Sequence, residues 1–203
     1  MMKRIAVLAS GQGTNLEAIL EAVERDEISG RVVLVLSDRE KAAALERARR
    51  RGIEALYLDP RPYRERAAYD RALLEPLQRS RCELVVLAGF MRLLSPVLLE
   101  AFPNRVMNIH PALLPSFPGT AGVEEALAYG VKVSGCTVHF VDGGLDTGPV
   151  ILQEAVPVLQ DDTVELLRGR IQAAEHRLYP RAIELYCRDQ LRVKGRRCLI
   201  ETG

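Results

Sequence analysis

The fold of this chain is decided by residues 5–23, which read IAVLASGQGTNLEAILEAV. Five apolar residues come first, and a turn with two glycines follows them. Leu16, Ile19, Leu20 and Val23 then recur at the spacing of one helix face. The stretch therefore predicts a buried strand, a tight glycine turn and a helix, which is the opening unit of an α/β fold.

Apolar runs and helical patterns continue to alternate along the chain. Further strands are predicted at residues 31–36, 53–58, 84–88 and 105–109, and helices at 41–51, 63–79, 96–102 and 124–129. Because these strands are apolar throughout, they fit a parallel sheet with helices on both faces. Residues 133–141 and 150–158 alternate more clearly, so they predict an antiparallel pair across the loop at 142–149.

The last part of the chain holds the longest predicted helix, residues 163–185, with Asp161 or Asp162 as its N-cap residue. Residues 191–193 are predicted to close one edge of the sheet. No internal repeat, low-complexity tract or linker interrupts the 203 residues. We therefore expect one α/β domain over residues 1–203, with a mostly parallel sheet and antiparallel additions in its C-terminal half.

Composition excludes several classes of partner. The chain has 28 basic and 27 acidic residues, a formal net charge of +1, which gives no long-range field for nucleic acid or anionic membranes. The arginines at positions 47–51 have no interleaved aromatic residues, which favours a solvated helix face over a nucleic-acid site.

The cysteines and the apolar runs indicate the cellular compartment of the protein. The four cysteines lack Cys-x-x-Cys spacing, which indicates reduced thiols, and no apolar run suits a membrane span or a signal peptide. These features predict a soluble, cytoplasmic protein without a nucleic-acid or membrane partner, and they leave open whether it is a monomer or a homodimer.

Residues 106–115, VMNIHPALLP, place an amide and an imidazole two positions apart. Alternate residues of a strand point to the same face, so Asn108 and His110 can aim at one site. An amide N–H and a protonatable imidazole suit a carbonyl under attack by an amine, because negative charge grows on oxygen while a proton leaves nitrogen. The pair predicts acyl-type transfer.

A glycine-rich acidic loop at residues 142–149 could supply a third group. A carboxylate from Asp142 or Asp146 would favour and orient the imidazolium form of His110, and the sequence does not decide between the two. The loop could also be a simple turn. A metal site formed by these aspartates and His139 is disfavoured, since the chain has no recognised metal-ligand spacing. A serine hydrolase is disfavoured too, because no serine lies in a Gly-x-Ser-x-Gly elbow.

The glycine turn at residues 11–15 brings backbone N–H groups and a helix N-terminus to a point where a phosphate could bind. Leu16 stands where the dinucleotide fingerprint has its third glycine, so a monophosphate fits better than a dinucleotide. An ordinary tight turn is one alternative. Another is a nucleotide-binding module without acyl transfer, in which Asp38, at the end of the second strand, would bind a ribose.

Residues 87–94, LAGFMRLL, end a central strand, and ligands of open α/β sheets gather beyond the carboxyl ends of strands. Phe90, Met91, Leu93 and Leu94 could line a slot for a flat heteroaromatic ligand. The alternative is that they complete the core, and the sequence alone slightly favours that interpretation.

Four ordered segments, residues 10–16, 85–92, 108–115 and 145–151, closely resemble the folate-dependent formyltransferase family, in particular the phosphoribosylglycinamide formyltransferases of purine synthesis. The likeness extends to about Tyr179. It implies a Rossmann-like α/β sheet and formyl transfer from 10-formyltetrahydrofolate to the amine of glycinamide ribonucleotide, without a metal. It also implies a nucleotide-phosphate half near residues 1–100 and a folate and catalytic half near residues 101–203.

The resemblance implies roles for individual residues, carried over by position. Asn108 and protonated His110 would stabilise the oxyanion, and Asp146 would keep His110 protonated. The other implied contacts are those of Gly13, Thr14, Asn15, Gln172 and Glu175 with glycinamide ribonucleotide, and those of Arg66, Met91, Arg92, Leu93, Leu94 and Asn108 with the folate.

Two neighbours in this family are disfavoured. Methionyl-tRNA formyltransferase carries a further C-terminal domain, for which we expect no room, and formyltetrahydrofolate hydrolase carries an N-terminal regulatory domain, whereas the catalytic pattern here begins within a few residues of Met1. One departure concerns residues 120–123, Thr-Ala-Gly-Val, which stand where many members have histidines in a mobile loop. The resemblance therefore leaves the closure of the folate loop open.

Overall fold

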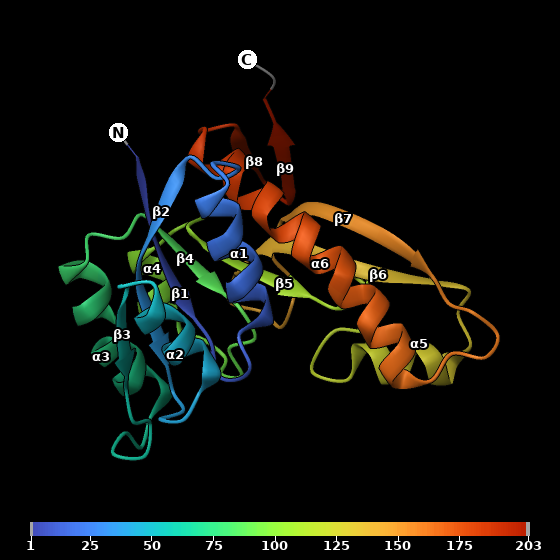
Figure 1. Ribbon diagram of the computed structural model, residues 1–203, viewed down its shortest axis with the longest axis horizontal. Coiled ribbons are helices and arrows are strands. Elements are labelled where there is room, and N and C mark those ends of the chain that lie inside the picture. Colours follow the sequence, from blue (N-terminus) through green and yellow to red (C-terminus); the bar gives the residue numbers. More distant parts are fainter. Residues whose placement is uncertain (1, 202–203) are drawn as a thin grey trace. The chain divides into compact units, whose positions relative to one another are not determined.

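The computed structural model describes residues 2–201, and its contacts group the chain into two compact units, one up to Met107 and one from Asn108 onward. Strands and helices alternate as the sequence predicts (Figure 1). The predicted α/β fold, with parallel strands first and antiparallel strands in the C-terminal half, is confirmed. The single domain over residues 1–203 stays a prediction, and the boundary between the units falls after Met107 rather than near residue 100.

The first unit is built on strands in the order β3-β2-β1-β4-β5, in which the pairs β3–β2, β2–β1 and β1–β4 are parallel. Strand β1 has neighbours on both sides, and residues 5–9 are completely buried, which explains why this stretch is apolar without alternation. The elements of this unit are β1 (Lys3–Leu8), α1 (Thr14–Glu24), β2 (Gly30–Ser37), α2 (Ala43–Arg50), β3 (Glu54–Tyr57), α3 (Arg66–Arg79), β4 (Leu84–Leu87), α4 (Pro96–Ala101) and the first part of β5 (Val106–His110).

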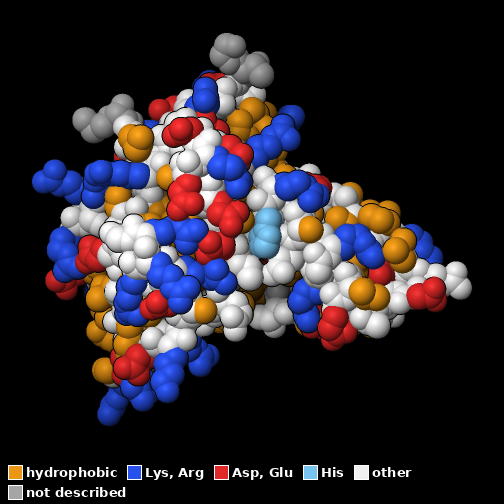
Figure 2. Space-filling model, viewed as in Figure 1, with side chains coloured by type: hydrophobic (Ala, Val, Ile, Leu, Met, Phe, Trp, Pro, Cys, Tyr) orange, Lys and Arg blue, Asp and Glu red, His pale blue; other side chains and the backbone are white. Residues whose placement is uncertain are grey.

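Ion pairs join the two helices that follow the glycine turn. Glu17 on α1 accepts hydrogen bonds from Arg47 and Arg51, which lie on and just after α2, and these bonds lower the pKa of Glu17. Arg49 and Arg50 are exposed, so the predicted solvated helix face is confirmed for this half of the run. Figure 2 shows acidic and basic side chains intermixed over α1 and α2. The first turn of α1 is therefore tied to its neighbour.

The second unit has strands in the order β6-β7-β9-β8. Strands β6 and β7 form a long antiparallel pair, and α6 packs across both (Figure 1). The elements of this unit are the end of β5, α5 (Gly122–Tyr129), β6 (Val133–Phe140), β7 (Val150–Pro157), α6 (Val164–Cys187), β8 (Leu191–Lys194) and β9 (Arg197–Ile200). The pair predicted across the loop at 142–149 is confirmed.

Two local predictions in this unit are wrong or incomplete. The N-cap of α6 is Thr163, whose hydroxyl accepts from the N–H of Leu166, and not Asp161 or Asp162. The carboxylate of Asp162 is engaged elsewhere, because it accepts from the N–H of Leu159 and from Arg170. Strand β9, which pairs with the predicted edge strand β8, was not expected.

The cysteines and the helices were the basis of two further predictions, and the structure describes both. All four cysteines are free, and burial raises the pKa of Cys82 to about 11 and of Cys136 to about 12. Among residues 2–201, none of the helices combines the length and the apolar character that crossing a bilayer requires.

Candidate active site

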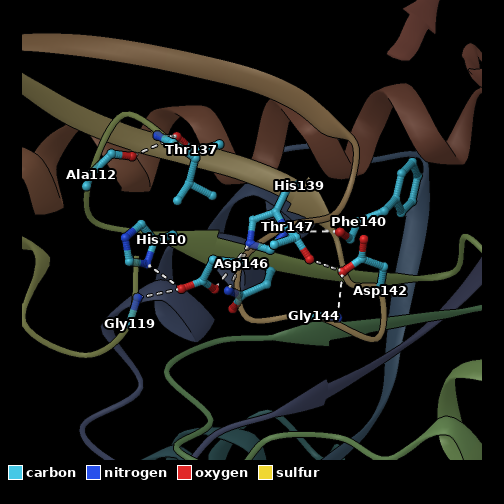
Figure 3. A network of polar contacts seen from close by, with 12 residues as sticks. His110, Ala112, Gly119, Thr137, His139, Phe140, Asp142, Gly144, Asp146 and Thr147 are labelled. Atoms are coloured by element: carbon cyan, nitrogen blue, oxygen red, sulfur yellow. Dashed lines mark hydrogen bonds and ion pairs between the residues drawn. The ribbon is translucent and has the colours of Figure 1, made fainter. Parts of the chain in front are cut away.

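Strand β5 carries Asn108 and His110 one pleat apart. Figure 3 shows His110, Asp146 and His139 close together. The imidazole of His110 is only 3% exposed, and its Nδ1 atom lies 3.5 Å from Oδ2 of Asp146. The amide nitrogen of Asn108 lies 3.2 Å from Nε2 of His139 on β6. The second unit therefore brings Asn108, His110 and Asp146 together, with His139 as a fourth member.

Asp146 comes from the glycine-rich loop that joins β6 to β7. Its backbone is left-handed, with φ at 53°, a conformation that aspartate tolerates better than most residues. Its Oδ2 accepts a 2.8 Å hydrogen bond from the N–H of Gly119 and lies near His110, while its Oδ1 lies 3.7 Å from Nε2 of His139. The carboxylate therefore lies between two imidazole rings.

Asp142, the other candidate carboxylate, shapes the loop instead. Its Oδ1 accepts from the N–H of Gly144 at 3.0 Å and from the hydroxyl of Thr147 at 2.6 Å. Two glycines are required in this loop, because a Cβ on Gly144 would meet Thr147 at 2.0 Å and one on Gly148 would meet the carbonyl oxygen of Phe140 at 1.7 Å. Of the two candidate carboxylates, Asp146 is therefore the one that lies beside His110.

Both ring nitrogens of His110 face oxygen acceptors. Nε2 lies 2.7 Å from the carbonyl oxygen of Phe117, and Nδ1 faces the carboxylate of Asp146. A carbonyl and a carboxylate accept but do not donate, so each ring nitrogen of His110 faces a group that can accept an N–H. Phe117 and Gly119 together hold the segment at 117–119 against the His110–Asp146 pair.

The turn after β5 is held by hydrogen bonds to Thr137 on β6. Its hydroxyl donates to the carbonyl of Ala112 at 2.7 Å and accepts from the N–H of Leu114 at 3.0 Å. Gln153 on β7 donates to Thr137 and to the carbonyl of Leu114. The backbone that follows His110 is therefore anchored to two strands.

In the first unit the glycine turn follows β1. Gly13 is the N-cap of α1 with φ at 70°, and a Cβ on it would lie 2.9 Å from Cβ of Ala44. Thr14 and Asn15 form the first turn of that helix. Backbone N–H groups at such a helix start can bind an anion.

The first part of the turn, residues 10–12, lines a cavity of about 670 Å³ together with the ends of β2 and β3 and Arg92. Asp38 also lines it. The side chain of Asp38 is buried, and its Oδ1 has no hydrogen-bond partner among the described residues. Gly13, Thr14 and Asn15 are not part of this cavity lining.

The segment after β4 is not core. Met91 is 67% exposed and Leu93 is 52% exposed, so the interpretation that they complete the core is wrong for these two residues. The guanidinium of Arg92 stacks over the ring of Tyr69 on α3, 4.9 Å from its centroid. Arg66 is exposed at the start of that same helix, one turn before Tyr69.

Gln172 and Glu175 lie on α6 in the second unit, with Glu175 buried. Within residues 2–201, no three His, Cys, Asp or Glu side chains are arranged to hold a metal ion.

A sequence profile of the family described as formyl transferase matches residues 3–183. The chain belongs to the formyl transferase family. Phosphoribosylglycinamide formyltransferase of Bacillus subtilis (strain 168) is 42% identical over 183 residues, which cover 90% of this chain and 94% of that protein. The trifunctional purine biosynthetic protein adenosine-3 of Bos taurus is 42% identical over 97% of this chain, which spans 20% of that protein.

Solved structures agree. Glycinamide ribonucleotide transformylase 1 from Symbiobacterium toebii has a TM-score of 0.96 and 57% identity, with 98% of this chain and 94% of that chain covered. The predicted family is confirmed, and the chain is a formyltransferase enzyme of purine biosynthesis. The alternative of a nucleotide-binding module without group transfer is therefore set aside.

Sequence reasoning missed several parts of this formyltransferase site. His139 was considered only as a metal ligand, although its place on the alternating strand β6 could have suggested an inward side chain. The carbonyl of Phe117 and the N–H of Gly119 were not expected at all, because backbone groups leave no residue-type signal.

Proposed function

We propose that this formyltransferase transfers the formyl group of 10-formyltetrahydrofolate to the amine of glycinamide ribonucleotide. The observation that carries the proposal is the contact of Asp146 with His110 beside the amide of Asn108. An amide, an imidazole with two acceptors and a carboxylate are the groups that an amine attack on a formyl carbon requires.

In the proposed reaction the amine nitrogen forms a bond to the formyl carbon, and the carbonyl π electrons move to oxygen. The N–H groups of Asn108 and of protonated His110 stabilise this oxyanion. Since Nδ1 of His110 faces Asp146, the donor to the oxyanion is the Nε2–H group, and the oxyanion replaces the carbonyl of Phe117 as its acceptor. The segment at 117–119 has to shift for this exchange.

Collapse of the intermediate breaks the bond between the formyl carbon and the folate nitrogen. The proton lost by the attacking amine passes to that departing nitrogen through His110 or a water molecule. The products are the formylated glycinamide ribonucleotide and tetrahydrofolate, and no metal ion enters these steps. Asp146 stabilises the ring of His110 in its charged form.

We assign the substrate contacts to the residues that the family resemblance implies. Gly13, Thr14 and Asn15 bind the phosphate of the nucleotide at the start of α1, and Gln172 and Glu175 on α6 bind the same substrate. Met91, Leu93 and Leu94 offer apolar surface to the folate ring, with Arg66 and Arg92 for its carboxylates. Support comes from the exposure of Met91 and Leu93 and from the N-cap of α1, where Gly13 makes no side-chain hydrogen bond.

We further propose a cytoplasmic monomer or homodimer that acts on small molecules. The net charge of +1 supports the absence of a nucleic-acid or membrane partner.

The direct test is an assay of the purified protein with glycinamide ribonucleotide and 10-formyltetrahydrofolate, following the formylated nucleotide and tetrahydrofolate. We expect equal amounts of both products. Release of formate without a formylated nucleotide would instead indicate a hydrolase. Asn108→Ala and His110→Ala should each lower kcat by about 10²–10³, and near-normal kcat in both would contradict their roles.

The phosphate assignment has a separate test. Glycinamide ribonucleoside, which lacks the phosphate, should have a much higher KM than the nucleotide. Equal KM values would leave the glycine turn with a structural role alone.

A further inference from the structure

The tautomer of His139 is fixed by its surroundings. Its side chain is 2% exposed, and Nδ1 lies 2.9 Å from the carbonyl oxygen of Phe140. Because a carbonyl oxygen can only accept, Nδ1 carries the proton and donates it. Burial lowers the pKa of His139, which supports a neutral ring, and Oδ1 of Asp146, at 3.7 Å from Nε2, is beyond hydrogen-bond distance. In that neutral ring Nε2 has a free lone pair.

That lone pair determines which end of the Asn108 amide faces His139. The amide nitrogen lies 3.2 Å from Nε2, and an acceptor nitrogen requires the NH₂ group rather than the carbonyl oxygen. Within residues 2–201 this is the only hydrogen bond of the Asn108 side chain. The NH₂ group has two hydrogens, so one remains to donate to a reacting oxygen.

We propose that His139 is a positioning residue, which holds the carboxamide of Asn108 with its second N–H ready for the developing oxyanion. The inference rests on the proposed function of Asn108. It gives His139 a role through Asn108 and no direct contact with the substrate. The chain of contacts is Phe140 carbonyl, His139 ring, Asn108 amide.

The test compares two amide substitutions that differ by one methylene. The side-chain oxygen of His139→Gln can reach the position of Nε2 and accept from Asn108, whereas that of His139→Asn is too short. We expect kcat of His139→Asn to fall about 10- to 100-fold, because a donor displaced by about 1 Å costs that order. His139→Gln should recover at least tenfold of this loss. KM for glycinamide ribonucleotide should stay within about threefold, since neither His139 nor Asn108 is among the residues assigned to bind it.

A double-mutant cycle shows whether His139 acts through Asn108. In an Asn108→Ala background the orientation of the amide no longer matters, so adding His139→Asn should lower kcat by less than about threefold. Thermal unfolding of each variant controls for loss of fold. If His139→Asn is unstable, His139→Gln still tests the inference. We expect the kcat of His139→Gln to exceed that of Asn108→Ala by at least tenfold.

Three results would overturn the inference while the proposed function stands. The first is an equal kcat for His139→Gln and His139→Asn. The second is a double-mutant cycle in which His139→Asn lowers kcat as much in the Asn108→Ala background as it does alone. The third is a rise in KM without a fall in kcat. Near-normal kcat in Asn108→Ala alone would instead remove the proposed role of Asn108, and the inference with it.

Discussion

Oδ2 of Asp146 lies 3.5 Å from Nδ1 of His110, and the same oxygen accepts the N–H of Gly119. A charged carboxylate at this distance favours the imidazolium form. Asp146→Asn removes this charge beside the ring, so the decline of kcat with rising pH should begin at a lower pH. Measurement of kcat between pH 5 and 9 tests this, with the exposed Asp161→Asn as the matched control. An unchanged profile would mean that another group sets this decline.

The hydroxyl of Thr137 serves two buried backbone groups, the carbonyl of Ala112 and the N–H of Leu114. Thr137→Val keeps the shape of the side chain but leaves both groups without this partner. We expect the free energy of unfolding to fall by about 1–3 kcal/mol, the cost of buried polar groups without hydrogen bonds. Urea unfolding measures it, and Thr120→Val at an exposed position should change stability by less than about 0.5 kcal/mol. Equal effects would argue against a specific anchor.

Gly13 combines a positive φ with close packing against Ala44, whereas a Cβ on Gly11 would meet nothing within 4 Å. Gly13→Ala should therefore destabilise the protein by about 1–3 kcal/mol, and it should raise KM for the nucleotide by displacing the start of α1. Gly11→Ala, the matched substitution two positions earlier, should be close to neutral for stability. Thermal unfolding of the two variants makes the comparison. If both are equally stable, the contact with Ala44 does not constrain the turn.

Burial lowers the pKa of His139 from its ordinary value of 6.5. Below that value the unfolded chain binds a proton that the folded protein binds less readily, so this residue makes stability decrease as pH falls. A single such group contributes a slope of at most about 1.4 kcal/mol per pH unit. Urea unfolding at pH 7.5 and 5.5 should show a smaller decrease for His139→Gln than for the unsubstituted protein. An identical decrease in both proteins would mean that protonation of His139 does not contribute to the pH dependence of the free energy of unfolding.

The order of strands and helices was predictable because a buried segment requires apolar residues along its whole length. The uniformly apolar residues 5–9 and 84–87 could only be strands covered on both sides, and both are fully or nearly buried. The failures are local. Asp161, Asp162 and Thr163 are all good N-cap residues, and the sequence does not contain the contact with Arg170 that draws Asp162 away. Strand β9 is short and mostly exposed, so it carries no burial signal.

The candidate site was predictable to a different extent. The two-residue spacing of Asn108 and His110 follows from the pleat, and it holds in β5. The choice between Asp142 and Asp146 depended on one left-handed residue and on hydrogen bonds inside the loop, which spacing does not encode. His139 lies 29 positions from His110, and only the pairing of strands brings its ring to Asn108.

The left-handed backbone of Asp146 limits how this enzyme can be altered by design. A longer acid such as glutamate, or any β-branched residue, would be disfavoured there before its chemistry mattered. Engineers who wish to retune proton handling at this position are left with asparagine and glycine as conformationally tolerant replacements, and both lack a carboxylate. New acidic chemistry would have to be introduced from a different segment, together with a redesigned connection between β6 and β7.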